Sequence, residues 1–180
     1  MDERASGDRS AWVMAALDQY EGALVAYAAR VTGDVHAARD VVQEAFLRLC
    51  GEDEARVGPH VKAWLYTVCR RLALDGLRKE RRMEPAGDAA LATRAGTETG
   101  PAERAETRDE ASRVLRLMAD LPPNQREVID LKFRHGLMYR EIAEATGLSA
   151  GNVGFLIHTG LKTLRERLGR EASRSAGGAL

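Results

Sequence analysis

The chain has 180 residues, 44% of them hydrophobic and 5% aromatic, and its 27 Lys and Arg residues balance 27 Asp and Glu residues. This length suits one large domain or two small ones. The two cysteines cannot form a disulfide framework, and no Cys/His cluster has zinc-ligand spacing. The apolar run at residues 11–17 is too short to span a bilayer, and no signal-peptide pattern is present. We therefore expect a cytoplasmic protein with no direct membrane insertion and no metal or other cofactor.

The charges are unevenly distributed along the chain. Residues 62–82 carry seven basic side chains against two acidic ones, and residues 112–180 carry eleven against seven. Residues 34–54 and 83–111 are both acidic. Any one such stretch could be an ordinary solvated helix face. Two basic segments separated by an acidic one are more typical of an intracellular protein that binds a polyanion.

The first half of the chain predicts three helices. Residues 1–10 are polar, and we expect them to fray. From Leu17 to Val31 apolar residues recur every three or four positions, which indicates a helix that Gly33 ends. Asp34 is a suitable N-cap for a second helix, whose apolar stripe runs to Leu49. Residues 50–59 look like a loop, and a third helix with basic residues follows to residue 82.

The second half predicts a linker and a further helical unit. Residues 83–108 are rich in Ala, Gly, Thr and Glu and contain few large apolar groups, so we expect a mobile linker. Helical periodicity returns at residue 111, Pro122-Pro123 interrupts it, and the last helix is predicted to end at Leu168. No segment alternates as a β-strand would, so the predicted fold is all-α, with two small helical domains.

A helix-turn-helix pattern is the strongest local motif. In YREIAEATGLSAGNV, residues 139–153, Ala143 is small where two helices must cross, and Gly147 can adopt the positive φ that ends a helix. Ser149 can cap the following helix. In such a motif the second helix enters the major groove of DNA. A helical hairpin with no DNA role is the alternative explanation of the same pattern.

The residues also resemble a known family. LPPNQREVIDLKFRHGLMYREIAEATGLSAGNV, residues 121–153, resembles domain four of the sigma-seventy family of RNA polymerase sigma factors, in particular its extracytoplasmic-function branch. DVVQEAFLRL, residues 40–49, and VKAWLYTVCRRLALDGLRKERR, residues 61–82, are similar to two helices of domain two. The resemblance implies domain two over residues 11–82, a flexible acidic linker over 83–110, domain four over 111–169 and a disordered tail over 170–180.

The resemblance implies two functional surfaces in domain two. Its helix at residues 40–49 would dock on core RNA polymerase; the matching positions are Asp40, Gln43, Glu44, Phe46 and Arg48. For Phe46, plain core packing is an equal alternative. The next helix would bind the minus-ten promoter element through Lys62, Tyr66, Arg70, Arg71, Arg78, Lys79, Arg81 and Arg82.

Several details of this second surface are open to test. The segment 50–60 and the start of the basic helix could hold an unpaired base. We expect Tyr66 to be exposed, Trp64 to belong to the core, and Asp75 to form a structural ion pair. Arg71 stands where the family usually has Asn, which changes the expected reading of base edges.

Domain four would bind the minus-thirty-five element through Arg140, Ser149, Asn152, Phe155, His158, Lys162 and Arg165. The last helix departs from the family, because Gly154, Leu156, Thr159 and Leu161 occupy positions where basic residues are common. Fewer phosphate contacts predict weaker and less salt-sensitive binding. Phe155 and Leu156 could contact thymine methyl groups or a partner protein.

We expect a sigma factor that binds core RNA polymerase and promoter DNA, melts the promoter without being an enzyme, is bound by an anti-sigma factor, and is a monomer when free. The alternative is a regulatory adaptor that binds polymerase or an anti-sigma factor and reads DNA weakly. A DNA-processing enzyme is disfavoured, because no nucleophile–base pair, paired carboxylates or phosphate loop is evident.

Overall fold

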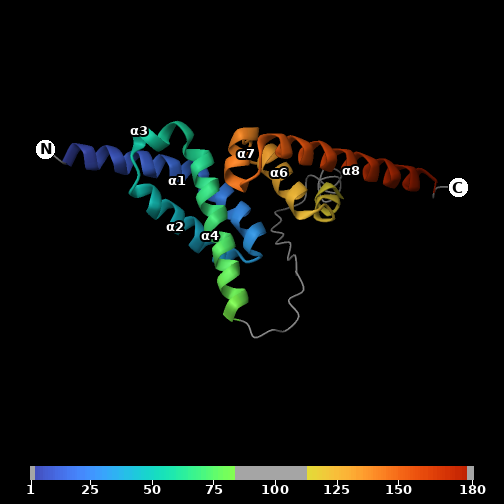
Figure 1. Cartoon of the computed structure of the whole chain (residues 1–180), viewed down its shortest axis with the longest axis horizontal. Helices are drawn as coiled ribbons and strands as arrows, with labels where there is room; N and C mark the ends of the chain where they lie inside the picture. Colours follow the sequence, from blue (N-terminus) through green and yellow to red (C-terminus); the bar gives the residue numbers. More distant parts are fainter. Residues whose placement is uncertain (1–2, 84–112, 178–180) are drawn as a thin grey trace, which may run out of the picture. The chain divides into compact units, whose positions relative to one another are not determined.

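The computed structural model describes residues 3–83 and 113–177, and all regular structure in these two segments is helical (Figure 1). They belong to two compact units, one made mainly of residues from the first half of the chain and one mainly of residues from the second. The predicted linker at 83–110 lies, except for Met83, outside the described residues. None of the described helices has the length and apolar character that crossing a bilayer would require.

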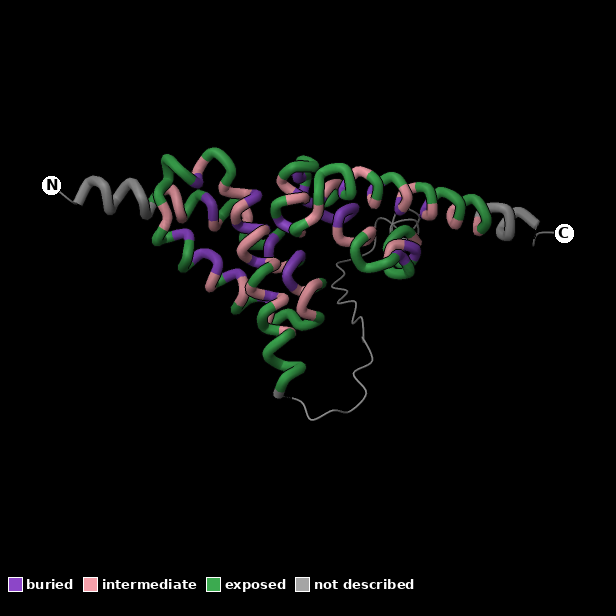
Figure 2. The backbone as a smooth tube through the Cα atoms, viewed as in Figure 1, coloured by how far each residue is buried: buried purple, intermediate pink, exposed green. Residues whose placement is uncertain are grey.

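The first unit is built from three long helices that pack against one another: α1 (Glu3–Thr32), α2 (Val35–Cys50) and α4 (Val61–Met83). Leu24, Leu49 and Leu65, one from each helix, are fully buried. Tyr27 of α1 and Tyr66 of α4 meet edge to face, with ring centroids 5.2 Å apart. Figure 2 shows the buried residues on the facing sides of these helices.

The boundary between α1 and α2 agrees with the sequence pattern. Gly33 has a φ of 77°, a left-handed conformation that ends α1. The Asp34 carboxylate accepts a hydrogen bond of 2.7 Å from the backbone N–H of Ala37, as expected of an N-cap. The start of α1 was predicted too late, because the helix already begins at Glu3. Ala, Glu and Arg in this polar stretch favour a helix by their intrinsic propensity. Because the stretch has no apolar stripe, its hydrophobic periodicity gives no sign of this helix.

The segment between α2 and α4 is more regular than predicted. Instead of a loop it forms a short helix, α3 (Glu54–Val57), and a 3₁₀ turn, η1 (Gly58–His60). Asp53 caps α3 by accepting a 2.9 Å bond from the backbone N–H of Ala55. Val57 is fully buried, and this one apolar anchor holds the segment against the helices.

The second unit contains a helix over residues 113–119 and then α6 (Pro123–Phe133), α7 (Tyr139–Thr146) and α8 (Ala150–Gly177). Its core includes Val128 and Leu131 of α6, Ile142 of α7, and Val153 and Ile157 of α8. Pro122 and Pro123 separate the first two helices as predicted, and Pro123 opens α6.

The last helix is longer than predicted. α8 continues to Gly177, well past Leu168, so most of the segment expected to be a disordered tail is helical. Part of the reason lies in ion pairs with the helix at 113–119. Arg113 pairs with Glu171, and Arg167 lies 3.2 Å from Asp120, just after that helix. Hydrophobic periodicity is a local pattern, so it cannot predict ion pairs between residues so distant in sequence.

The helix-turn-helix geometry is confirmed. Gly147 has a φ of 74° and its N–H donates to the Ala143 carbonyl at 2.9 Å, which ends α7. The Ser149 hydroxyl accepts a 3.2 Å bond from the backbone N–H of Asn152 and so caps α8. Further along α8, a Cβ added at Gly160 would lie 2.6 Å from the Ile129 side chain, so this glycine lets α6 and α8 cross closely.

Candidate nucleic-acid and protein interfaces

One face of α2 presents polar groups to solvent. Asp40 and Gln43 are exposed, and Arg48 lies 2.9 Å from the Glu44 carboxylate, both being about half exposed. A pair of this kind adds little stability, which leaves both groups available to a partner. Four of the five positions predicted to contact polymerase are therefore on or near the surface.

Phe46 does not belong to that exposed face. Its side chain is only 6% exposed and is part of the core, in agreement with the alternative of plain packing. Its neighbour Leu47 is 61% exposed and lies four residues after Gln43, one turn along the same face. The sequence motif contains both apolar residues, and only the helix rotation distinguishes the buried one from the exposed one.

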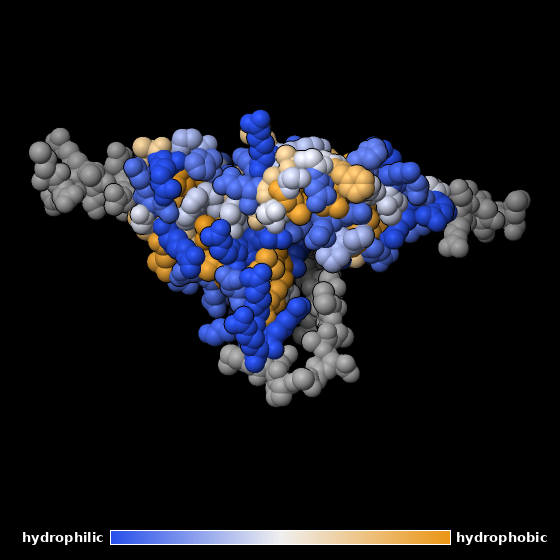
Figure 3. Space-filling view, viewed as in Figure 1, coloured by the Kyte–Doolittle hydropathy of each residue, from blue (hydrophilic) through white to orange (hydrophobic). Residues whose placement is uncertain are grey.

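The basic residues of α4 lie mainly on one side and towards one end. Tyr66, Cys69 and Ala73 face the core, whereas Arg71, Arg78 and Arg82 are exposed at spacings of seven and four residues. Lys79 and Arg81 are also exposed, and Lys62 and Arg70 are half-buried. Figure 2 shows the last turns of α4 exposed, and Figure 3 shows this end covered by hydrophilic side chains.

Asp75 lies within this basic stripe. Its carboxylate is 2.9 Å from the Arg78 guanidinium, and both side chains are well exposed, which confirms the predicted ion pair. The acidic group lies four residues after Arg71 and three before Arg78, so it lowers the positive potential between them.

The aromatic residues of α4 differ from the prediction. Tyr66 is 1% exposed and packs against Tyr27, so it is a core residue and its ring cannot stack on a base. Trp64 is only half-buried rather than fully in the core. Trp64 and Tyr66 are two positions apart and so point to different sides of α4. Which of the two is buried depends on the side of α4 against which α1 packs.

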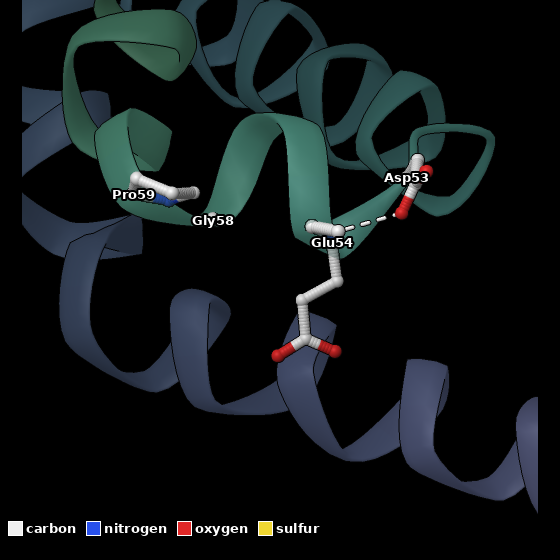
Figure 4. Close-up of a pocket in the computed structure, with 5 residues that line it drawn as sticks. Asp53, Glu54, Gly58 and Pro59 are labelled. Atoms are coloured by element: carbon white, nitrogen blue, oxygen red, sulfur yellow. Dashed lines mark hydrogen bonds between the residues drawn. The ribbon is translucent and has the colours of Figure 1, made fainter.

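A shallow recess lies beside the start of α4. It is lined by Asp53, Glu54, Ala55, Gly58 and Pro59 (Figure 4). The Asp53 carboxylate is engaged by the α3 backbone, and the Glu54 side chain extends towards α1. A Cβ at Gly58 would lie 3.9 Å from the Trp12 indole nitrogen of α1. The recess therefore combines carboxylate acceptors with a nearby aromatic ring.

The exposed face of α8 carries most of the residues predicted to read DNA. Asn152, Phe155, His158, Lys162 and Arg165 recur at steps of three and four and are all exposed. Ser149 and Arg140 are exposed as well. Of the two apolar residues expected on this face, only Phe155, at 63%, is well exposed; Leu156 is half-buried.

The positions that lack basic residues mostly have structural roles. The Tyr139 ring lies 3.5 Å from where a Cβ at Gly154 would be, in ordinary packing contact with α8. The Thr159 hydroxyl donates to the Phe155 carbonyl at 2.9 Å and receives a bond from Gln125 of α6 at 3.3 Å. Thr159 is therefore turned towards its own unit. The exposed side chains in the first turns of α8 are then mainly the Asn152 amide and the Phe155 ring.

Two buried groups lie apart from these surfaces. Burial raises the pKa of the Cys69 thiol to about 12, which keeps it protonated and unreactive. His135 and Asp130 are both buried, with 3.2 Å between imidazole and carboxylate, and they link the end of α6 to the following turn. In the segments that the structure describes, no group of three His, Cys, Asp or Glu side chains is placed to hold a metal ion.

Comparisons with known proteins agree with this division. The family model for Sigma-70 region 2 matches residues 16–83, and that for Sigma-70 region 4 matches residues 111–164. The ECF RNA polymerase sigma factor SigL of Mycobacterium tuberculosis is 31% identical over 169 residues, which are 89% of this chain and 91% of SigL. The ECF sigma factor RpoE of Cereibacter sphaeroides is 33% identical over 73% of this chain and 70% of its own.

A longer relative and two solved structures extend the comparison. The probable RNA polymerase sigma factor RfaY of Xanthomonas campestris is 33% identical over 82% of this chain, but only 38% of RfaY is covered. The sigma factor RpoE from Bartonella quintana, in complex with the anti-sigma factor NepR, has a TM-score of 0.60 at 22% identity, covering 86% of this chain and 95% of that one. CnrH, in complex with the cytosolic domain of CnrY, has a TM-score of 0.52 at 25% identity, covering 94% and 90%.

Proposed function

Because the chain belongs to the extracytoplasmic-function family of RNA polymerase sigma factors, we propose that it binds core RNA polymerase, recognises a promoter and melts it. The observation that carries the proposal is the presence, in one chain, of an exposed basic α4 in the region 2 unit and a capped helix-turn-helix in the region 4 unit. Sigma factors are non-catalytic, so the work of melting comes from binding energy. The proposed role places the protein in the cytoplasm, with the chromosome.

We propose that α2 docks on core polymerase. Its exposed face combines Asp40 and Gln43, which can bond a partner helix, with the Glu44–Arg48 pair and an apolar anchor. The anchor is Leu47, since Phe46 is buried in the unit's own core. Exposed apolar residues surrounded by polar ones are typical of protein-binding patches.

For the minus-ten element we propose that the exposed Arg and Lys residues of α4 bind phosphates while the recess at residues 53–59 receives an unpaired base. The carboxylates there can accept bonds from exocyclic amino groups, and Trp12 lies close enough to border the site. Trapping an unstacked base favours the open duplex without ATP, since an extruded base that is bound cannot pair again.

For the minus-thirty-five element we propose that α8 enters the major groove, with Asn152 and Phe155 towards the bases. Lys162 and Arg165, two to four turns further along, would contact phosphates. Arg140 lies in the first turn of α7, at the end of that helix away from the Gly147 turn, and would contact a phosphate from the other helix of the motif. With few cations on α8, this contact is expected to be weak and only modestly dependent on salt.

We further propose an anti-sigma factor as a partner. The sigma factor RpoE from Bartonella quintana was solved in complex with the anti-sigma factor NepR, and CnrH, of similar fold, was solved in complex with the cytosolic domain of CnrY. An adaptor that binds polymerase and reads DNA weakly is the second candidate, and the reduced positive charge of α8 favours it.

The test is run-off transcription with bacterial core polymerase, the full chain and a library of promoter fragments. We expect transcripts from a subset of fragments, reduced by Lys79→Ala and Arg78→Ala but not by Arg170→Ala, an exposed cation near the end of α8. If no fragment is transcribed although the protein binds core polymerase, the adaptor is the better description.

The docking surface is tested by binding to core polymerase. Leu47→Ala is expected to weaken the complex by about tenfold, as loss of an interface anchor does, while the fold stays intact. Met14→Ala, which removes another exposed apolar side chain from the same unit, is the matched control. Equal effects of both substitutions would contradict a specific role for Leu47.

A further inference from the structure

We infer that Phe155 reads DNA sequence by contacting the C5-methyl group of a thymine in the major groove. The inference rests on the proposed promoter recognition and goes beyond it, because it assigns a base type and a chemical group to one side chain. The minus-thirty-five element would accordingly contain a thymine whose methyl group, and not only its pairing, is recognised.

The burial of α8 shows that Phe155 has no role in its own unit's core. Val153 and Ile157, two residues to either side, are buried, whereas Phe155 remains 63% exposed. Exposing a ring of this size to water is unfavourable, and any contact that covers it gains the hydrophobic free energy. Phe155 is thus held ready for a contact outside the unit.

The position of Phe155 within α8 points to DNA bases. In a helix-turn-helix, the N-terminal residues of the second helix meet the base edges. Phe155 lies one turn after Asn152, and the Ser149 hydroxyl bonded to the Asn152 N–H fixes the start of the helix. The Tyr139 ring packs on the helix beside Gly154, so the turn that carries Phe155 is also supported from α7.

The surroundings of Phe155 favour nucleic acid over an apolar protein surface. Its neighbours on the exposed face are Asn152, His158 and Lys162. On the other side, the Lys132 ammonium lies 5.4 Å from the centroid of the Tyr139 ring. An apolar ring flanked by amide, imidazole and ammonium groups suits a groove in which the base edges are bordered by phosphates.

The chemistry of the base edges then selects thymine. A phenyl ring cannot form hydrogen bonds with N7, O6, N6 or O4, and the thymine methyl is the apolar group that the major groove offers. The nearby positions Gly154, Leu156 and Thr159 carry no guanidinium to read guanine. Asn152, one turn away, has the amide that suits adenine, so the two side chains together favour a step rich in A·T pairs.

The test uses polymerase holoenzyme formed with the full chain and a promoter obtained from the transcription library. Each minus-thirty-five thymine is replaced in turn by deoxyuridine, which removes the C5-methyl group and leaves base pairing unchanged. We expect the affinity of the wild-type holoenzyme to fall about fourfold at one position, the factor that corresponds to one buried methyl group. Phe155→Ala should bind thymine and uracil promoters equally, and Phe155→Leu should retain part of the difference.

Phe133→Ala is the matched control, because Phe133 is 62% exposed in the same unit but lies at the end of α6. It should keep the full preference for thymine. The inference is overturned if no uracil substitution affects the wild type, or if Phe155→Ala retains the preference. If Phe155→Ala instead lowers the affinity of the chain for core polymerase, the ring contacts protein. If the wild type initiates at no promoter, the proposed function itself fails.

Discussion

At the scale of single residues, Gly147 shows how strongly one backbone conformation constrains the second unit. Its φ of 74° allows α7 to end and α8 to begin within three residues. A side chain at this φ meets the backbone sterically, although nothing else in the unit lies within 4 Å of the site. The constraint is therefore one of conformation and not of space.

Replacing Gly147 with Ala is expected to lower the free energy of unfolding of the second unit by about 1 kcal/mol. Gly151→Ala is the control, since Gly151 also has open space around it but lies at the start of α8 without a positive φ, and its replacement should not destabilise. Urea unfolding followed by circular dichroism measures both. Both tryptophans lie in the first unit, so a change seen only in tryptophan fluorescence would contradict the assignment.

The two cysteines should differ sharply in reactivity. Cys50 is exposed, whereas burial raises the pKa of the Cys69 thiol to about 12. At pH 8 a thiol reagent should modify one cysteine in the native protein and two in denaturant, and Cys50→Ser should abolish the native reaction. Because the native state favours the protonated thiol of Cys69, its contribution to stability is present below pH 9 and declines as pH rises towards 12. Rapid native modification of the Cys50→Ser protein would contradict the burial.

At the scale of elements, α4 shows that the net charge of a segment differs from the charge of a surface. The helix has buried residues on one side as far as Ala73, and beyond them its last turns are exposed and carry Arg78, Lys79, Arg81 and Arg82. Asp75 is the one carboxylate in the stripe that Arg71 and Arg78 share. The element is thus a core helix in its first half and a charged extension in its second.

Asp75→Asn is expected to strengthen promoter binding, because it releases Arg78 to bind phosphate, and Arg82→Ala is expected to weaken it. The dependence of log affinity on log salt concentration should become steeper for Asp75→Asn and shallower for Arg82→Ala, each by about 0.9 for one phosphate contact. Holoenzyme binding to duplex promoter over a series of salt concentrations measures both slopes. Parallel shifts with unchanged slopes would indicate that neither residue affects a phosphate contact.

At the scale of the whole molecule, the proposed function requires the two units to be joined. Each presents a modest basic surface, and the second is poor in cations on α8. Binding of one unit raises the local concentration of the other, so weak contacts add up to a strong one only while the chain is continuous.

Cleaving the chain between the units should therefore abolish most promoter-directed transcription. With a specific protease site inserted between residues 84 and 110, we expect activity to fall by roughly a hundredfold or more after cleavage. The uncut protein with the same insertion is the control. Full activity of the cleaved protein at low concentration would show that polymerase alone holds the two units in place.

The sequence alone determined the helical class, the division into two units, the caps at Asp34 and Ser149, and the turn at Gly147. It also predicted the family, since motifs of the first and second units occur in order. These are properties of local spacing and of residues whose backbone preferences act within a turn or two. The added length of α1 and the helix at residues 54–57 lie outside the motifs, where the hydrophobic periodicity carries no information.

Only the tertiary structure decided which of two neighbouring apolar or aromatic residues faces outward. Phe46 is buried and Leu47 exposed; Tyr66 is buried while Trp64 is partly exposed. A helix that is apolar over a wide arc can rotate by one residue at little local cost, and the packing of α1 against α2 and α4 selects the rotation. The ion pairs of Arg113 and Arg167 account for part of the length of α8, and contacts between such distant parts of the chain leave no periodic trace in the sequence.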